Sequence, residues 1–178
     1  MKLKFSLFLI VCLYINIYSQ ENISVEKNQF KINLILPGIV YEHGFTEKNT
    51  LYSEFSLGFG YRSSYFGGNT WSFYPNINEQ FRHYYNLQKR ADNGKRTDKN
   101  SGNFLALNAI YNFESISTKK DFSEDTSSFT IAPVWGFQRT YKGGFNLSVN
   151  GGIGYNIDKY DNEFVPVINF SLGWVIGK

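Results

Sequence analysis

Strict alternation over a long C-terminal run is the feature that most restricts how this chain can fold. From Phe164 to Ile176 every second residue is apolar, and the residues between are valine, asparagine, serine or glycine. A period of two indicates a β-strand. Strands of soluble domains usually have about 5–6 residues, whereas a strand tilted across a bilayer has about 9–11. The run therefore predicts a strand with one face in lipid and one facing a polar interior.

The same alternation recurs along the chain, which predicts further strands at 144–157, 128–140, 103–115, 70–85 and 50–62. In 144–157, for example, Phe145, Leu147 and Val149 share one face, and asparagine, serine and glycine occupy the other. Aromatic residues make up 19% of the chain. Transmembrane barrels use such residues in bands at the two membrane interfaces, so this excess favours the same fold.

The segment 29–46 contains two alternation patterns of opposite phase. Apolar residues occupy even positions from Phe30 to Leu36, and continuing that phase would place Glu42 in lipid. A break at Pro37-Gly38 reverses the phase, because proline cannot donate a ladder hydrogen bond and glycine permits a sharp bend. We expect two short strands, 29–36 and 39–46, which gives the even number usual in bacterial barrels. The alternative is one long strand with a bulge.

The predicted fold class is therefore all-β, an eight-stranded antiparallel up-and-down transmembrane β-barrel. Lys142-Gly143-Gly144 reads as a tight turn and 116–127 as a long polar loop. Outer-membrane barrels have short periplasmic turns and longer outer loops. This places Gly143, the C-terminus and the 86–102 connection on the periplasmic side, although 86–102 is long for such a turn.

Residues 1–19 are expected to be a secretory signal peptide, and 20–178 to form the barrel domain. Lys2 and Lys4 precede an apolar run from Phe5 to Leu13, too short for a comfortable membrane helix. The only cysteine, Cys12, lies in that run, so the mature chain has no disulfide framework. The predicted location is the outer membrane.

Four charged residues fall on the inward phases: Lys31, Glu42, Glu54 and Arg82. An eight-stranded barrel is just wide enough for side chains to fill its interior. Because burying a charge is costly unless it is paired, we predict an ion network that plugs the interior. Replacing Arg82 with alanine should then lower stability clearly, whereas Arg90→Ala in the connection should do little.

The chain resembles the small OmpA-barrel-like outer-membrane proteins of bacteria, a group of unknown function. The matching stretches are Phe30-Lys31-Ile32-Asn33-Leu34, Tyr41-Glu42 before Gly44, Thr50-Leu51, and Pro75 through Arg82-His83-Tyr84-Tyr85 to Ser101-Gly102-Asn103-Phe104. The resemblance implies eight strands and no assigned activity. Such proteins often end in an aromatic residue, whereas this chain ends Ile176-Gly177-Lys178, which leaves Trp174 to serve that role.

For function, the sequence favours a non-enzymatic structural or interaction barrel, expected to be a monomer without cofactor or metal. The alternative is a narrow channel or porin for ions or small solutes. A lipid-modifying enzyme ranks third, because the two histidines, His43 and His83, have no serine two residues away. His83 falls on the outward phase with Glu79, but the two are about 13 Å apart along the strand.

The expected partners follow from charge. Without Lys2 and Lys4, the 18 basic residues of the whole chain nearly balance the 15 acidic ones, so the composition gives no argument for nucleic acid. Outer-membrane lipid is the main expected partner. Basic residues gather in the 86–102 connection, which suggests a periplasmic protein or peptidoglycan as a further partner; they are Lys89, Arg90, Lys95, Arg96 and Lys99.

Overall fold

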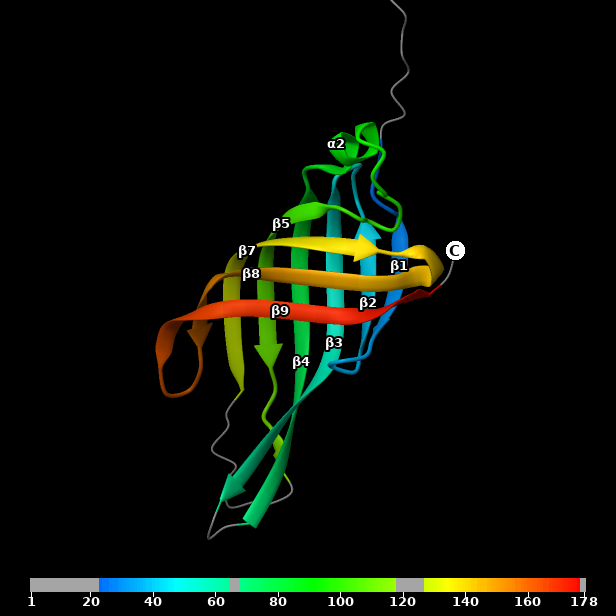
Figure 1. Cartoon of the computed structure of the whole chain (residues 1–178). Coiled ribbons are helices and arrows are strands. Elements are labelled where there is room, and N and C mark those ends of the chain that lie inside the picture. Colours follow the sequence, from blue (N-terminus) through cyan, green and yellow to red (C-terminus); the bar gives the residue numbers. More distant parts are fainter. Residues whose placement is uncertain (1–22, 65–67, 118–126, 177–178) are drawn as a thin grey trace, which may run out of the picture.

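The computed structural model describes residues 23–64, 68–117 and 127–176, and the predicted signal peptide lies outside this part of the chain. Eight antiparallel strands form a closed ring, in which each strand pairs with its neighbours in sequence (Figure 1). They are β1 (Asn28–Asn33), β2 (Gly38–Gly44), β3 (Asn49–Ser64), β4 (Gly68–Tyr84), β5 (Asn103–Asn112), β7 (Ser128–Thr140), β8 (Phe145–Ile157) and β9 (Asn162–Ile176). The predicted all-β fold with eight antiparallel strands is confirmed.

The ring closes where the first strand meets the last. β1 pairs with β9 from Phe30 opposite Ile176 to Asn33 opposite Gly173. β1 also pairs with β2 around the turn at 34–37. The predicted division of 29–46 into two strands is therefore confirmed, although the turn lies at 34–37 and Gly38 already belongs to β2, and the alternative of one long bulged strand is wrong.

The predicted strand ends differ from the observed ones by a few residues. β3 and β4 extend beyond 50–62 and 70–85 at their shared turn, and β5 ends before residue 115. The segment 116–127 was expected to be loop throughout, but Ile116–Ser117 forms a short strand, β6. Its pairing of Ile116 with Phe73 extends the sheet along β4, and residues 118–126 lie outside the described part.

The outer face of the ring is apolar and the inner face is largely polar, as the alternation predicts. On β9, Ile168 has 79% of its surface exposed, whereas the adjacent Val167 has 6%. Every second residue of β1, β5 and β7 is likewise exposed and mostly apolar. Because side chains alternate across a strand, one face of each strand lines the interior.

The connections sort to two ends of the ring. The turn between β7 and β8 contains Gly143 and Gly144 with φ of +85° and +86°, which glycine adopts without steric cost. The same end carries the 86–102 connection, whose helix α2 spans Leu87–Asp92 (Figure 1). The turn at 34–37 and the connection at 158–161 lie at the other end. The placement of Gly143 and the 86–102 connection at one end matches the sequence prediction.

Candidate functional site

Three of the four predicted interior charges meet inside the ring. The Lys31 ammonium lies 2.7 Å from the Glu42 carboxylate, and the Arg82 guanidinium lies 3.9 Å from the same oxygen. All three side chains are almost fully buried. Lys31, Glu42 and Arg82 are referred to below as the ion triad. They come from β1, β2 and β4, which belong to one run of consecutively paired strands.

Neutral side chains complete the hydrogen bonding of the triad. The amide oxygen of Gln138 accepts from Lys31 at 2.6 Å and from Arg82 at 3.2 Å. The other carboxylate oxygen of Glu42 accepts from the hydroxyls of Tyr84 and Thr50, at 2.8 and 2.9 Å. Buried ions are tolerated when their remaining hydrogen-bonding positions are filled in this way.

Two aromatic rings hold the Arg82 guanidinium. Its carbon lies 3.6 Å from the Tyr52 ring centroid and 4.3 Å from that of Phe104. A guanidinium gains electrostatic energy over an aromatic face, and planar stacking fixes its orientation. Gly136 provides the space, because a Cβ there would lie 2.7 Å from the tip of the Phe104 ring. Arg82 is therefore fixed by packing as well as by charge.

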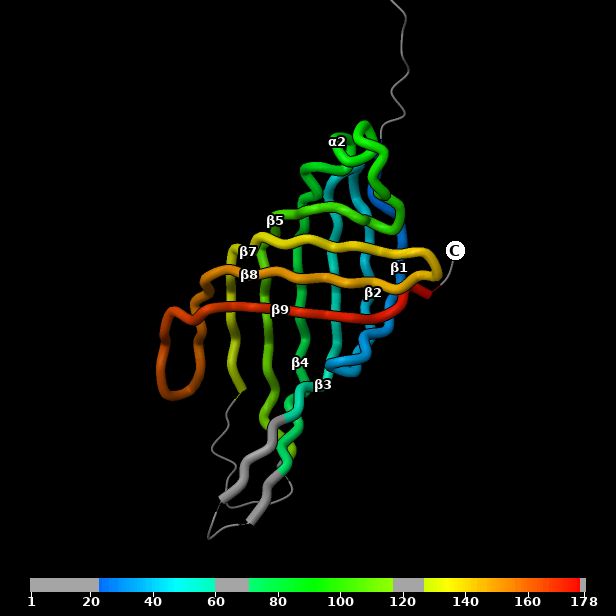
Figure 2. Tube along the Cα trace, in the orientation of Figure 1, coloured from blue at the N-terminus to red at the C-terminus, as the bar shows by residue number. Residues whose placement is uncertain are grey.

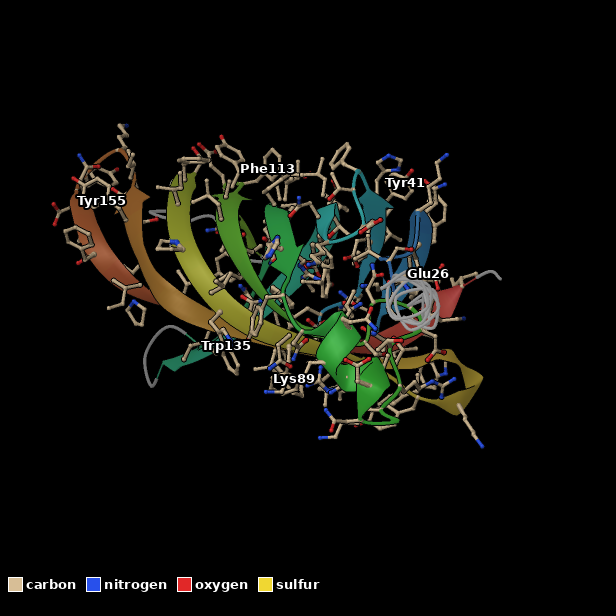
Figure 3. The ribbon with its side chains drawn as sticks, turned by 90° about the horizontal axis from the view of Figure 1, so that it is seen from above. Glu26, Tyr41, Lys89, Phe113, Trp135 and Tyr155 are labelled. Atoms are coloured by element: carbon tan, nitrogen blue, oxygen red, sulfur yellow. The ribbon has the colours of Figure 1, made fainter. Side chains whose placement is uncertain are left out.

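The 86–102 connection lies at the end of the ring beside the triad, the end nearest the viewer in Figure 3. Asn100 and Ser101 are buried, and the Gln138 amide donates to the backbone carbonyls of Lys99 and Asn100. Leu87 packs in the same apolar cluster as Tyr84 and Phe104. The length of this connection, which is unusual for a turn, therefore has a structural use as a lid.

Some basic side chains of the lid bond to other residues of the lid itself. Arg90 donates to the backbone carbonyls of Ser101, at 2.8 Å, and Arg96, at 3.0 Å. Desolvation on partial burial lowers the pKa of the Arg90 guanidinium. Arg96 forms an exposed ion pair with Asp98. Arg90 thus braces the lid. Arg90→Ala should therefore lower stability more than the substitution of a solvated loop residue would.

Glu54, the fourth predicted residue, lies away from the triad. Its carboxylate accepts from Asn33 at 2.6 Å, Tyr52 at 3.0 Å and Asn78 at 3.3 Å. The register explains the separation, because Glu42 pairs with Tyr52 and Glu54 pairs with Val40. Glu54 is therefore one inward position farther from the lid, joined to Arg82 through the Tyr52 side chain and a chain of hydrogen-bonded amides.

Beyond Glu54 the interior is hollow. A cavity of about 310 Å³ extends from Arg82 and Tyr52 past Glu54 toward the end opposite the lid. Six asparagines line it: Asn33, Asn76, Asn78, Asn112, Asn150 and Asn169. We call it the polar cavity. The interior thus has two parts, a filled half at the lid and a hollow polar half at the other end.

Several important interior residues were missed by the sequence analysis, although the alternation contains their signal. Gln138 and Phe104 occupy the inward phases of 128–140 and 103–115, and Tyr52 that of 50–62. The expected network contained charged residues only, without the amide and aromatic groups that hold those charges.

The histidines lie on the outer face near the lid end. His43 is within 2.8 Å of Asn28, and His83 within 2.7 Å of Asn49. Glu79, on the same face of β4, accepts from the Ser53 hydroxyl instead. Within the described residues there is no cluster of side chains suited to a metal ion. None of the described helices has the length and apolar character to cross a membrane.

Comparisons with protein family models, curated proteins and solved structures found no match to this chain.

Proposed function

We propose that this protein is an eight-stranded β-barrel of a bacterial outer membrane with a non-enzymatic structural or interaction role. The observation that carries the proposal is the inverted polarity of the ring. Among the described residues, the buried set contains more polar and charged side chains than apolar ones. Large apolar side chains instead cover the outside, where water would make their exposure unfavourable and lipid would not.

Aromatic residues on the outside support the same proposal. Tyr41, Phe113, Trp135 and Tyr155 are all exposed and point away from the ring (Figure 3). At the lid end, the Trp135 indole N–H donates to the Tyr85 hydroxyl at 2.8 Å. Aromatic side chains with a polar atom suit the boundary between hydrocarbon and water. We expect the lid to face the periplasm, because the tight turn at Gly143 lies at the same end and outer-membrane barrels have their short turns on that side.

The filled half of the interior favours a closed barrel over a channel. A conducting path would have to pass the ion triad, whose members are nearly inaccessible to solvent and bonded to one another. The lid then covers the same end. A role for the lid in binding a periplasmic protein or peptidoglycan stays a prediction, as does the monomeric state.

One set of measurements tests the proposal. The refolded chain should enter detergent micelles and liposomes, give a β-type circular dichroism spectrum, and migrate differently on gels when unheated. In planar bilayers it should give no steady conductance. Recovery as a folded protein in detergent-free buffer would overturn the membrane assignment. Steady ion conductance would show that the protein is a narrow channel and not a closed barrel.

A further inference from the structure

β1 and β2 are shorter than the other strands of the ring, so the wall that they form ends nearer the lid. Pairing between β1 and β9 stops at Asn33 opposite Gly173, with one further bond from the Leu34 N–H to the Leu172 carbonyl. Pairing between β2 and β3 stops at Gly38 opposite Ser56, with one further bond from the Leu57 N–H to the Pro37 carbonyl. β9 and β3 continue past this point, and among described residues each is then paired on one side only (Figure 2). We call this opening the notch.

The free edge of β9 has a definite chemical character. Because Leu172 directs its carbonyl toward β1, residues of the same parity direct their backbone groups into the notch. These are Phe164, Pro166, Ile168 and Phe170. Pro166 has no N–H, so one unpaired donor is absent from this edge.

The turn at the base of the notch is apolar throughout. Leu34, Ile35 and Leu36 are 54%, 44% and 39% exposed, and Pro37 follows them. Turns in water are normally built from glycine, asparagine, aspartate or serine. The turn at the other end of β2 contains Thr46, Glu47 and Lys48. An apolar turn of this kind suits hydrocarbon.

Strand length places this turn at membrane depth. β1 has 6 residues. At about 3.3 Å per residue it spans about 20 Å before tilt, less than the apolar band of about 25 Å on a transmembrane barrel. Unpaired strand edges are not left exposed to hydrocarbon, so something must occupy the notch.

The polar cavity reaches this same opening. Its lining includes Asn33 and Leu36 at the base of the notch and the consecutive residues Val165 to Ser171 of β9. The Ser148 hydroxyl also lines the cavity, and this buried group has no hydrogen-bond partner among the described residues. Polar groups that could receive a ligand thus lie directly behind an apolar, lipid-facing entrance.

We propose that the notch admits an amphiphile sideways from the bilayer, with its polar head in the polar cavity and its acyl chain over Leu34, Ile35 and Leu36. The head would carry hydroxyl or amide groups and no net charge. The reason is that Lys31 and Arg82 balance Glu42 and Glu54, while asparagine and serine dominate the rest of the lining. This inference rests on the proposed membrane location.

The first test measures the depth of the notch. Ile35→Cys and Thr46→Cys, each made with Cys12→Ser, are labelled with an environment-sensitive fluorophore in liposomes. Acyl-chain nitroxide lipids should quench the label at position 35 strongly and that at position 46 weakly. Equal, weak quenching in protein that has inserted would place the notch outside the hydrocarbon and overturn the inference alone. Failure to insert would overturn the proposed function as well.

The second test measures binding of radiolabelled monomyristoyl glycerol to the inserted protein. Binding should saturate at one molecule per chain, and free glycerol should not compete. Asn169→Leu, inside the cavity, should weaken binding at least tenfold, whereas Asn162→Leu, at the exposed end of the same strand, should leave it unchanged. Ser148→Ala should weaken binding several-fold without loss of stability, since it removes an unpartnered hydroxyl.

Three results would overturn the inference while leaving the barrel proposal intact. They are no saturable binding by inserted protein, equal binding by the Asn169→Leu and Asn162→Leu variants, and a dimer that pairs through β9. The last would mean that a second copy of the chain fills the notch.

Discussion

The guanidinium carbon of Arg82 lies 3.6 Å from the centroid of the Tyr52 ring, deep inside the ring of strands. Tyr52 also donates its hydroxyl to Glu54 at 3.0 Å. One aromatic side chain therefore links the ion triad to the carboxylate beside the polar cavity. The filled and hollow halves of the interior meet at this residue.

Substitutions at Tyr52 should separate its two contributions. Tyr52→Phe keeps the aromatic face and loses one hydrogen bond, so it should cost about 1 kcal/mol of unfolding free energy. Tyr52→Leu also loses the stacking on a desolvated guanidinium, which should cost about 2 kcal/mol more. Urea unfolding in detergent micelles measures both. Equal losses would show that the ring does not stabilise Arg82.

Removing Arg82 should be among the most damaging single changes. Arg82→Ala leaves Glu42 with one buried cation and creates a cavity between the two aromatic rings. It should lower the unfolding free energy by about 3–5 kcal/mol. Arg96→Ala breaks an exposed pair with Asp98, which water screens, so it should leave the stability almost unchanged. It replaces Arg90→Ala as the control, because Arg90 braces the lid. Similar melting temperatures for the Arg82→Ala and Arg96→Ala variants would contradict a closed interior.

The two interior glutamates should respond differently to loss of charge. Glu42→Gln leaves Lys31 and Arg82 buried without their counter-ion, and should cost about 3–5 kcal/mol. Glu54→Gln should cost less, because its partners are neutral donors that an amide oxygen can also accept from. Unfolding of the two variants under identical conditions tests the ranking. A larger loss at Glu54 would contradict the assigned triad.

Space at Gly136 should be essential. A Cβ there would lie 2.5 Å from that of Asn150 and 2.7 Å from the Phe104 ring, so Gly136→Ala should cost about 1–3 kcal/mol. Gly58→Ala is the matched control, since its nearest neighbour would be the Tyr74 carbonyl at 3.5 Å. That change should stay within about 0.5 kcal/mol. A stable Gly136→Ala variant would mean that Phe104 is not packed against β7.

The 158–161 connection should be sensitive to acid. The backbone N–H groups of Asp161 and Tyr160 donate to the Asp158 carboxylate and hold its pKa below the usual 3.8. Because the folded-state pKa is lowered, this stabilisation is present above the unfolded pKa and is lost as the pH falls through the folded one. Amide chemical shifts of both residues should titrate at that pH. Asp158→Asn should abolish the titration.

Much of the interior could be predicted because a strand has only two faces. The alternation in β9 assigns Ile168 to the outside and Asn169 to the inside without knowledge of any neighbour. The phase reversal at Pro37-Gly38 likewise separates β1 from β2. What the alternation cannot supply is register, because it gives the face of a residue and not its height in the ring. The register places Glu42 beside Lys31 and keeps Glu54 away from both.

The sequence alone determined the local properties of this protein: strand type, the apolar and polar faces, the tight turn at Gly143, and the charges that must lie inside. These depend on residues close together in the chain. Only the tertiary structure decided the contacts between strands distant in sequence, such as Gln138 with Lys31 and the lid over Tyr84. It also decided the notch, which exists because β1 and β2 are short while β3 and β9 are long. Such features depend on how strands align once the ring closes.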